Sequence, residues 1–144
     1  MSRYFVPFTG GKIMNNEKIG GISAMLGGVF GFLFGRMDGM LYALIAFMAL
    51  DYITGLAVAW IRREISSEVG FRGIAKKVLI LALVAVGHIL DSFVLGGGAV
   101  CRSAVTGFYL ANEGISILEN AGNAGLPLPK KLVEVLHQLK SKEE

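Results

Sequence analysis

The sequence predicts an all-α membrane protein with about four transmembrane helices, both ends in the cytoplasm, and a short amphipathic helix near the C-terminus. Hydrophobic residues make up 53% of the 144 residues and charged residues only 17%, whereas soluble domains are roughly 25% charged. The hydrophobic residues gather in four stretches, and almost all Lys and Arg residues fall outside them. A globule of this size leaves much of its surface in water. The chain has too few polar residues to cover such a surface, which argues against an ordinary soluble enzyme.

The four apolar stretches are residues 19–35, 40–61, 78–95 and 99–118. A helix needs about 20 residues to cross roughly 30 Å of hydrocarbon, and the second stretch, with 22 residues, is the clearest. The third and fourth have 18 and 20 residues and are adequate. The first has 17 and is rich in glycine. A spanning helix is expected there, with an interfacial or re-entrant helix, or the apolar part of a secretory signal, as alternatives.

The distribution of basic residues predicts the topology. With four spans, an N-terminal arm (residues 1–18), the loop after the second span and a tail (residues 119–144) share one side of the membrane, and residues 19–118 form the transmembrane domain. That side holds 12 of the 14 Lys and Arg residues. Basic loops stay in the cytoplasm, which places both ends inside. Three spans are the alternative, and they would distribute the Lys and Arg residues less unevenly between the two sides of the membrane.

The loop between the second and third spans is strongly basic. Ser66 and Glu68 fit the start of a short helix, and Gly70 and Gly73 would allow a turn before the third span. The basic residues of the loop are predicted to anchor it at the inner leaflet, with a gating or partner-binding role as the alternative. These inner-leaflet anchors are Arg62, Arg63, Arg72, Lys76 and Lys77.

The tail contains a helix predicted to begin near Pro129, because proline is tolerated in the first turn of a helix. Leu132, Leu136 and Leu139 recur at helical spacing with lysines elsewhere, which is typical of an amphipathic helix. We expect this helix to lie on the inner leaflet or to associate with itself.

Polar residues inside the predicted spans are the main candidates for function, because ionisable groups are expensive in a bilayer. We expect them to line a pore or to bond to neighbouring helices. Asp91 and Arg102 lie on the outer side of the third and fourth predicted spans, and the short turn at Gly96–Gly98 makes these two spans neighbours. We therefore expect an ion pair between Asp91 and Arg102 in the outer leaflet. The candidates are Asp51, His88, Asp91, Arg102, Asn112 and Glu113.

Small residues recur every three or four positions along the first span, and such stripes let membrane helices approach closely. They predict packing either within one chain or between copies. The helix-packing candidates are Gly20, Ala24, Gly27, Gly31 and Gly35, with Gly55 in the second span.

The polar residues do not form a catalytic constellation. No nucleophile stands beside a base, Cys101 is the one cysteine and lacks metal-ligand spacing, and no phosphate-binding loop is present. No face combines basic and aromatic residues as nucleic-acid binding would need. We therefore expect no enzymatic activity, no cofactor and no nucleic-acid partner. The chain is too small to form a gated path alone, so polar groups that face water would need several copies around them, as in a homo-oligomeric pore.

Four motifs, taken in order, resemble a known family. They are Asp51-Tyr52-Ile53-Thr54-Gly55, the loop sequence SSEVGFRGIAKK from Ser66 to Lys77, NEGISILEN from Asn112 to Asn120, and GLPLPKKL from Gly125 to Leu132. Together they are similar to the phage holin group that includes clostridial toxin-secretion holins. The similarity covers about residues 41–139.

This resemblance implies a protein that accumulates in the cytoplasmic membrane of a bacterial host and then assembles into lesions. The lesions would release a peptidoglycan hydrolase (an endolysin) and lyse the cell, or export a large toxin. The implied partners are membrane lipids, other copies of the chain, and the hydrolase or toxin. Some holins use paired starts, which makes Met14 a candidate second start. A small ion channel or transporter, and an antiholin or structural membrane partner without lytic activity, are the alternative functions.

Overall fold

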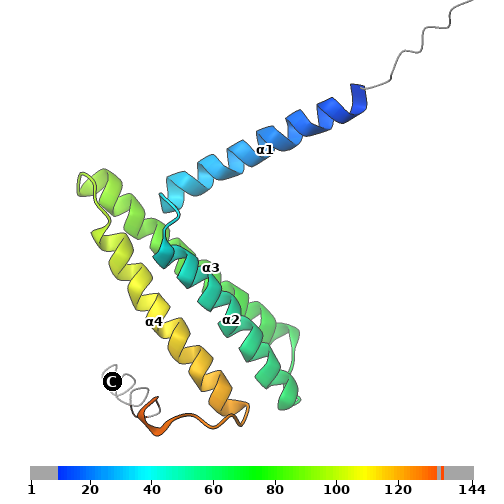
Figure 1. The fold of residues 1–144 in the computed structure, drawn as a ribbon, viewed down its shortest axis with the longest axis vertical. Helices are drawn as coiled ribbons and strands as arrows, with labels where there is room; N and C mark the ends of the chain where they lie inside the picture. Colours follow the sequence, from blue (N-terminus) through cyan, green and yellow to red (C-terminus); the bar gives the residue numbers. More distant parts are fainter. Residues whose placement is uncertain (1–9, 133, 135–144) are drawn as a thin grey trace, which may run out of the picture. The chain divides into compact units, whose positions relative to one another are not determined.

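The computed structural model describes residues 10–132 and 134, with side chains from residue 18 onward. Its helices are α1 (Gly10–Phe34), α2 (Gly39–Ile61), α3 (Ser67–Ile89), the π-helical turn η1 (Leu90–Val94) and α4 (Val100–Asn123) (Figure 1). No strand occurs among the described residues, which confirms the predicted all-α class. The chain divides into two units, residues 1–36 and residues 37–144.

Within the described part of the chain, two helical segments are long and apolar enough to cross a membrane. They are Gly39–Ile61, which is α2, and Ser67–Val94, which is α3 continued through η1. The apolar part of α1, Lys18–Phe34, is shorter. The first segment includes the second predicted span, and the second includes the third predicted span except its last residue. Spans at residues 19–35 and 99–118 stay predictions.

The second unit is a bundle in which α2, α3 and α4 lie side by side, each antiparallel to the next along the chain (Figure 1). α4 packs against both α2 and α3. Among the side chains that the structure describes, the buried apolar ones belong to α2 and α3. They are Leu41, Leu44, Met48, Val58 and Ala59 of α2, and Ile80, Val84 and Ala85 of α3. The buried side chains of α4 are all polar. They are Arg102, Thr106 and Glu113.

The basic loop is shorter than predicted, because α3 begins at Ser67 and runs without a break through the two glycines expected to form a turn. The Ser66 hydroxyl caps its first turn by accepting the Val69 N–H at 3.2 Å. A Cβ at Gly73 would lie 3.0 Å from two ring carbons of Tyr52, and one at Gly70 would lie 3.4 Å from the Tyr52 hydroxyl oxygen. The glycines therefore allow α3 to approach α2 and do not form a turn.

The turn between η1 and α4 is made by three glycines. Gly96, Gly97 and Gly98 all have positive φ, at 76°, 119° and 101°, a region that side chains with a Cβ rarely occupy. This tight reversal brings the first turn of α4 back against the end of α3. The antiparallel neighbours predicted from the glycine turn are confirmed.

In the first unit, α1 carries Gly20, Ala24, Gly27 and Gly31 along one side, as their spacing requires. Gly35 is different, because α1 ends at Phe34 and Gly35 has φ of 69°. Its N–H donates to the Gly31 carbonyl oxygen at 2.8 Å. Gly35 thus terminates the helix, one residue before the end of the predicted apolar stretch 19–35.

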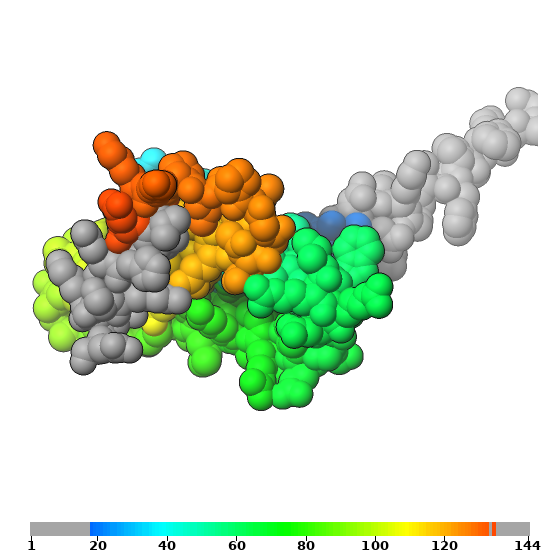
Figure 2. All heavy atoms as spheres, turned by 90° about the horizontal axis from the view of Figure 1, so that it is seen from below, coloured from blue at the N-terminus to red at the C-terminus, as the bar shows by residue number. Residues whose placement is uncertain are grey.

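At the opposite end of the bundle from the glycine turn, the α2–α3 connection and the end of α4 meet. Figure 2 shows this end, with the connection in green beside the last part of α4 and the following residues in orange. Arg62 Nη2 donates to Asn123 Oδ1 at 2.8 Å across this junction. Lys130–Leu132 are helical, consistent with a helix starting near Pro129. The remaining leucines of that predicted helix lie outside the described residues.

Candidate functional site

A cluster of three charged side chains joins the three helices of the bundle. The amino group of Lys77 (α3) forms ion pairs with the carboxylates of Asp51 (α2) and Glu113 (α4). These side chains are 12%, 16% and 1% exposed, respectively. We call this set the Lys77 cluster. It contributes one contact from each helix, so it ties the whole bundle together.

Asn120, two turns after Glu113 on α4, extends the cluster. Its Nδ2 donates to Asp51 Oδ1 at 3.1 Å, to the Asp51 carbonyl oxygen at 3.2 Å and to Thr54 Oγ1 at 3.0 Å. A Cβ at Gly55 would lie 3.6 Å from this Nδ2 atom, which is ordinary van der Waals contact. Asp51 is therefore held by a side chain from α3 on one side and by one from α4 on the other.

The arrangement explains how so many ionisable groups are accommodated in apolar helices. An unpaired charge at the centre of a membrane helix costs about 2.5–3.5 kcal/mol on insertion scales. Lys77 offsets this cost for two carboxylates at once, leaving one net negative charge in the ionised cluster. Asn120 adds neutral hydrogen bonds to that charge. The single chain thus pairs charges that would otherwise need water.

The other end of the bundle holds a second polar group around Asp91, which is 0% exposed. Its Oδ1 accepts the Cys101 N–H and its Oδ2 accepts the Arg102 N–H, both at 2.9 Å. The first N–H groups of a helix have no partner within the helix and carry its positive dipole end, so a carboxylate placed there satisfies two of them. A Cβ at Gly87 would lie 3.0 Å from Arg102 Cα, which shows how closely α3 and α4 approach.

The predicted ion pair between Asp91 and Arg102 needs correction. The two residues do meet, but through the backbone amide of Arg102. The guanidinium instead pairs with Asp38, with Arg102 Nη1 2.8 Å from Asp38 Oδ2. The reason is that the first turn of α4 offers Asp91 two amides, which leaves the long Arg102 side chain to reach the start of α2. Asp38 precedes the second predicted span and was not among the predicted site residues.

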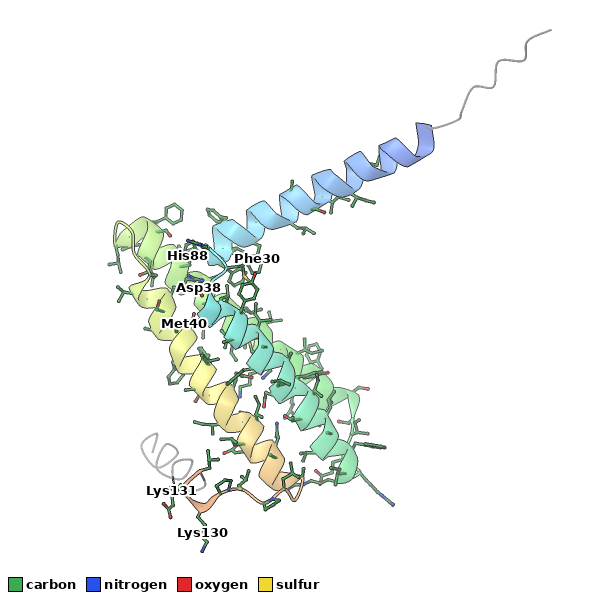
Figure 3. All side chains as sticks on the ribbon, viewed as in Figure 1. Phe30, Asp38, Met40, His88, Lys130 and Lys131 are labelled. Carbon is green, nitrogen blue, oxygen red and sulfur yellow. The ribbon has the colours of Figure 1, made fainter. Side chains whose placement is uncertain are left out.

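Asp38 also caps α2, since its Oδ1 accepts the Leu41 N–H at 2.9 Å. This hydrogen bond lowers the pKa of Asp38, the charge of Arg102 lowers it further, and partial burial opposes both. Figure 3 labels Asp38 and His88 at the end of the bundle where α2 begins. The His88 ring is half-buried, with Nε2 3.5 Å from the Ser92 hydroxyl.

The remaining candidates are scattered. Asn112 is half-buried on α4, and Arg63, Arg72 and Lys76 are exposed. Arg72 pairs with Glu68 one turn earlier, at 2.7 Å. The structure therefore brings Asp51 and Glu113 together around Lys77 and places Asp91 and Arg102 at the other end of the bundle.

Sequence reasoning missed the central role of Lys77, which it grouped with the inner-leaflet anchors. The third span was taken to start at Val78, whereas α3 starts at Ser67 and already contains Lys77 in its interior. The serine cap before α3 and the exposed Glu68–Arg72 pair were the available signals for the longer helix. Thr54 and Asn120 belong to two of the four motifs, but their contacts with each other and with Asp51 were not predicted.

A cavity of about 260 Å³ opens beside the Lys77 cluster, between the three helices. Polar and apolar side chains line it in similar numbers. The lining residues are Asp51, Tyr52, Gly55, Leu56, Val69, Gly73, Lys76, Ser116, Glu119 and Asn120. Among the described residues, no three His, Cys, Asp or Glu side chains form a metal-binding group. The site thus consists of paired charges between helices with a polar opening beside them.

Comparison with known proteins identifies the group to which these features correspond. Residues 28–141 match the sequence profile of the bacteriophage holin family. An uncharacterised Listeria innocua protein is 47% identical over 110 residues, which are 76% of this chain and 78% of that protein. A 14.9 kDa Clostridium perfringens protein is 42% identical over 92% of this chain and 98% of its own length. A probable holin of Bacillus phage phi105 is 32% identical over 76% of this chain and 80% of its own. No solved structure matches the chain.

Proposed function

Because the chain belongs to the bacteriophage holin family, we propose that it assembles in the bacterial cytoplasmic membrane and permeabilises it. Permeabilisation would release a peptidoglycan hydrolase and lyse the host cell, or export a large toxin. The observation that carries this proposal is the family match over most of the chain, together with the similarity to a probable phage holin.

The outer surface of α2 and α3 supports a position in lipid. Both helices expose large apolar side chains, such as Ile53 at 61% and Leu79 at 65%. Soluble monomers rarely expose large contiguous apolar patches. We place α2 and α3 across the membrane, with α1 and α4 as further spans and both ends of the chain in the cytoplasm. A three-span arrangement without α1 is the alternative.

The internal pairing of charges supports a two-stage course of action. A single copy whose carboxylates are already paired with Lys77 does not need water around them to enter the bilayer. Single copies would therefore accumulate without leakage, and permeabilisation would begin when copies assemble. The lesion would be a homo-oligomer, because one small bundle does not surround an aqueous path.

Inducible expression in a bacterial host tests the proposal. We expect growth to continue while the protein accumulates, followed by an abrupt loss of membrane potential, measured with a potential-sensitive dye. Co-expression of a leaderless peptidoglycan hydrolase should convert that loss into lysis, and expression of the hydrolase alone is the control. Cells that keep both potential and growth at high membrane levels of the protein would contradict the proposal.

Liposomes containing the purified protein distinguish the alternative activities. A holin-type lesion should release fluorescent dextrans as well as small dyes once the protein density passes a threshold. An ion channel would pass ions and retain dextrans. An antiholin would release neither, and would delay lysis by a co-expressed holin.

A further inference from the structure

We propose that one face of α4 becomes the water-lining surface of the assembled lesion, and that Lys77 holds this face closed in the single copy. The proposal rests on the proposed permeabilising function and extends it by naming the surface and the residue that restrains it. We call this face the polar seam. It consists of Arg102, Thr106, Glu113, Ser116 and Asn120.

The polar seam runs along the inward side of α4. Its members are separated by three, four or seven residues, so they lie on one side of the helix. Thr106 is 2% exposed and Glu113 1%. On the opposite side, Val100 is 75% exposed and Phe108 54%. α4 therefore turns its polar side toward α2 and α3 and its apolar side outward.

Partners on other helices hold the seam at three levels. Arg102 pairs with Asp38 at one end, Glu113 pairs with Lys77 in the middle, and Asn120 donates to Asp51 at the other end. Water can replace such partners at small cost, because each polar group then bonds to a water molecule instead. Apolar side chains that lose their contacts cannot form hydrogen bonds to water in their place. The contact between α4 and its neighbours is thus the part of the bundle that water can open most readily.

Space for water already exists beside the seam. The cavity of about 260 Å³ is lined by Ser116 and Asn120 of the seam and by Asp51 opposite them. A water molecule occupies about 30 Å³ in the liquid and needs two to four polar partners in a buried site. The cavity has room for several waters and polar groups to bind them, so hydration of the seam can begin here.

Lys77 opposes this opening. Its ammonium group lies between a carboxylate of α2 and a carboxylate of α4, so it attracts both helices toward α3. Without that charge, Asp51 and Glu113 would repel each other. Water between α4 and its neighbours would then be favoured. Lys77 thus acts as a latch on the seam.

Thiol labelling tests which face of α4 meets water. In a Cys101→Ser background, Thr106→Cys and Ser116→Cys report on the seam, and Ala104→Cys and Phe108→Cys report on the outward face of the same helix. A membrane-impermeant maleimide is applied before and after loss of membrane potential, and labelling is measured in full-length protein. We expect both seam positions to be protected before permeabilisation and labelled after it, with both outward positions protected throughout.

The outcomes separate this inference from the proposed function. If the variants permeabilise the membrane while both seam positions stay unlabelled, or while only the outward positions become labelled, the inference is wrong and the proposed function stands. If no variant permeabilises and the unsubstituted protein does not either, the proposed function fails. The labelling result at Thr106→Cys or at Ser116→Cys alone is sufficient to decide between these outcomes.

The timing of permeabilisation tests the latch. Lys77→Met is expected to shorten the time to loss of potential several-fold at equal membrane levels. Arg72, an exposed cation on the same helix, provides the control. Arg72→Met should leave the time unchanged, and Lys77→Arg should retain most of the delay because it keeps the charge. Equal times for Lys77→Met and Arg72→Met would overturn the latch.

A milder variant covers the case in which Lys77→Met does not reach the membrane. Glu113→Gln removes the charge on α4 but leaves Lys77 paired with Asp51. We expect this change to advance the loss of potential. Timing identical to that of the unsubstituted protein would overturn the latch on α4.

Discussion

α2 and α4 are neighbouring helices of similar length that bury opposite kinds of residue. α2 turns Leu41, Leu44 and Met48 into the bundle, as a helix of a soluble protein would. α4 instead buries Arg102, Thr106 and Glu113 and exposes Val100 and Phe108. In lipid, apolar side chains gain little from leaving the surface, and polar contacts join helices. The difference teaches that α2 is held to the bundle by apolar packing as well as by the Asp51 carboxylate, whereas α4 is held mainly by polar contacts.

The largest loss of stability should follow from disrupting the paired charges that hold α4. Lys77→Met leaves two carboxylates without their cation and should destabilise the bundle by about 3–5 kcal/mol, as removal of one partner from a buried pair does. Unfolding in detergent, followed by circular dichroism, measures the change. Lys76→Met should shift stability by less than about 0.5 kcal/mol, as exposed substitutions do. Equal effects at the two positions would mean that the Lys77 cluster contributes nothing.

Shortening a buried apolar side chain of α2 should reduce the stability of the bundle by less. Leu44 is 0% exposed, and Leu44→Ala should cost about 1–3 kcal/mol, at or below the low end of the roughly 2–5 kcal/mol found in soluble cores. The cost is reduced because detergent or lipid also solvates the apolar side chain in the unfolded chain. Ile53→Ala, at a position that is 61% exposed, serves as the control in the same assay. A larger loss for Leu44→Ala than for Lys77→Met would reverse the comparison.

A pair of glycines tests how closely α4 must approach its neighbours. Gly87→Ala would place a Cβ 3.0 Å from the backbone of Arg102, which cannot rotate away, so a loss of about 1–3 kcal/mol is expected from overpacking. Gly107→Ala would meet only the flexible end of Met40 at 3.5 Å. It should be neutral or gain up to about 1 kcal/mol of helix propensity. The stability of both variants is measured by thermal unfolding. If Gly87→Ala and Gly107→Ala changed the stability in the same direction, this would count against close α3–α4 contact.

The smallest effect is expected at Asp38. Because its pKa is lowered in the folded protein, its contribution is present above the ordinary value of 3.8 and is lost as pH falls through the lowered value. Asp38→Asn keeps a good helix cap but removes the ion pair with Arg102. Asp38 is 45% exposed, so the loss at neutral pH should stay below about 1 kcal/mol.

Melting temperatures measured from neutral pH down to about 3 check this prediction. The difference between the unsubstituted protein and Asp38→Asn should shrink toward the acid end. A difference that grows on acidification would show that the sign is wrong.

The helical class and the second span followed directly from local pattern. The predicted span 40–61 differs from α2 by one residue at its start, because a stretch of 22 residues with Asp51 as its one charged residue has few alternatives to a helix. The helix that contains most of the third predicted span begins 11 residues before that span, at Ser67. Glycine is a turn residue in isolation, and only the ring of Tyr52 on another helix reveals why Gly70 and Gly73 stand inside a helix.

Several residues of the candidate site were predicted, but the partners with which they pair were not. Asp51, Glu113, Asp91 and Arg102 were identified because charges in apolar stretches need a reason, and all four make polar contacts. Their partners depend on how helices distant in the sequence are placed side by side. That is why Lys77 and Asp38, both outside the predicted spans, were assigned no such role.

Composition and the order of apolar and basic residues were enough to predict a helical membrane protein and, through four motifs, its family. Those properties depend on hydropathy and local backbone preference, which act within a few residues along the chain. Tertiary packing decided that the charges are satisfied inside one copy, and that α4 turns its polar side inward. Lys77 reaches Asp51 across 26 positions and Glu113 across 36, and contacts over such separations arise only when the helices meet.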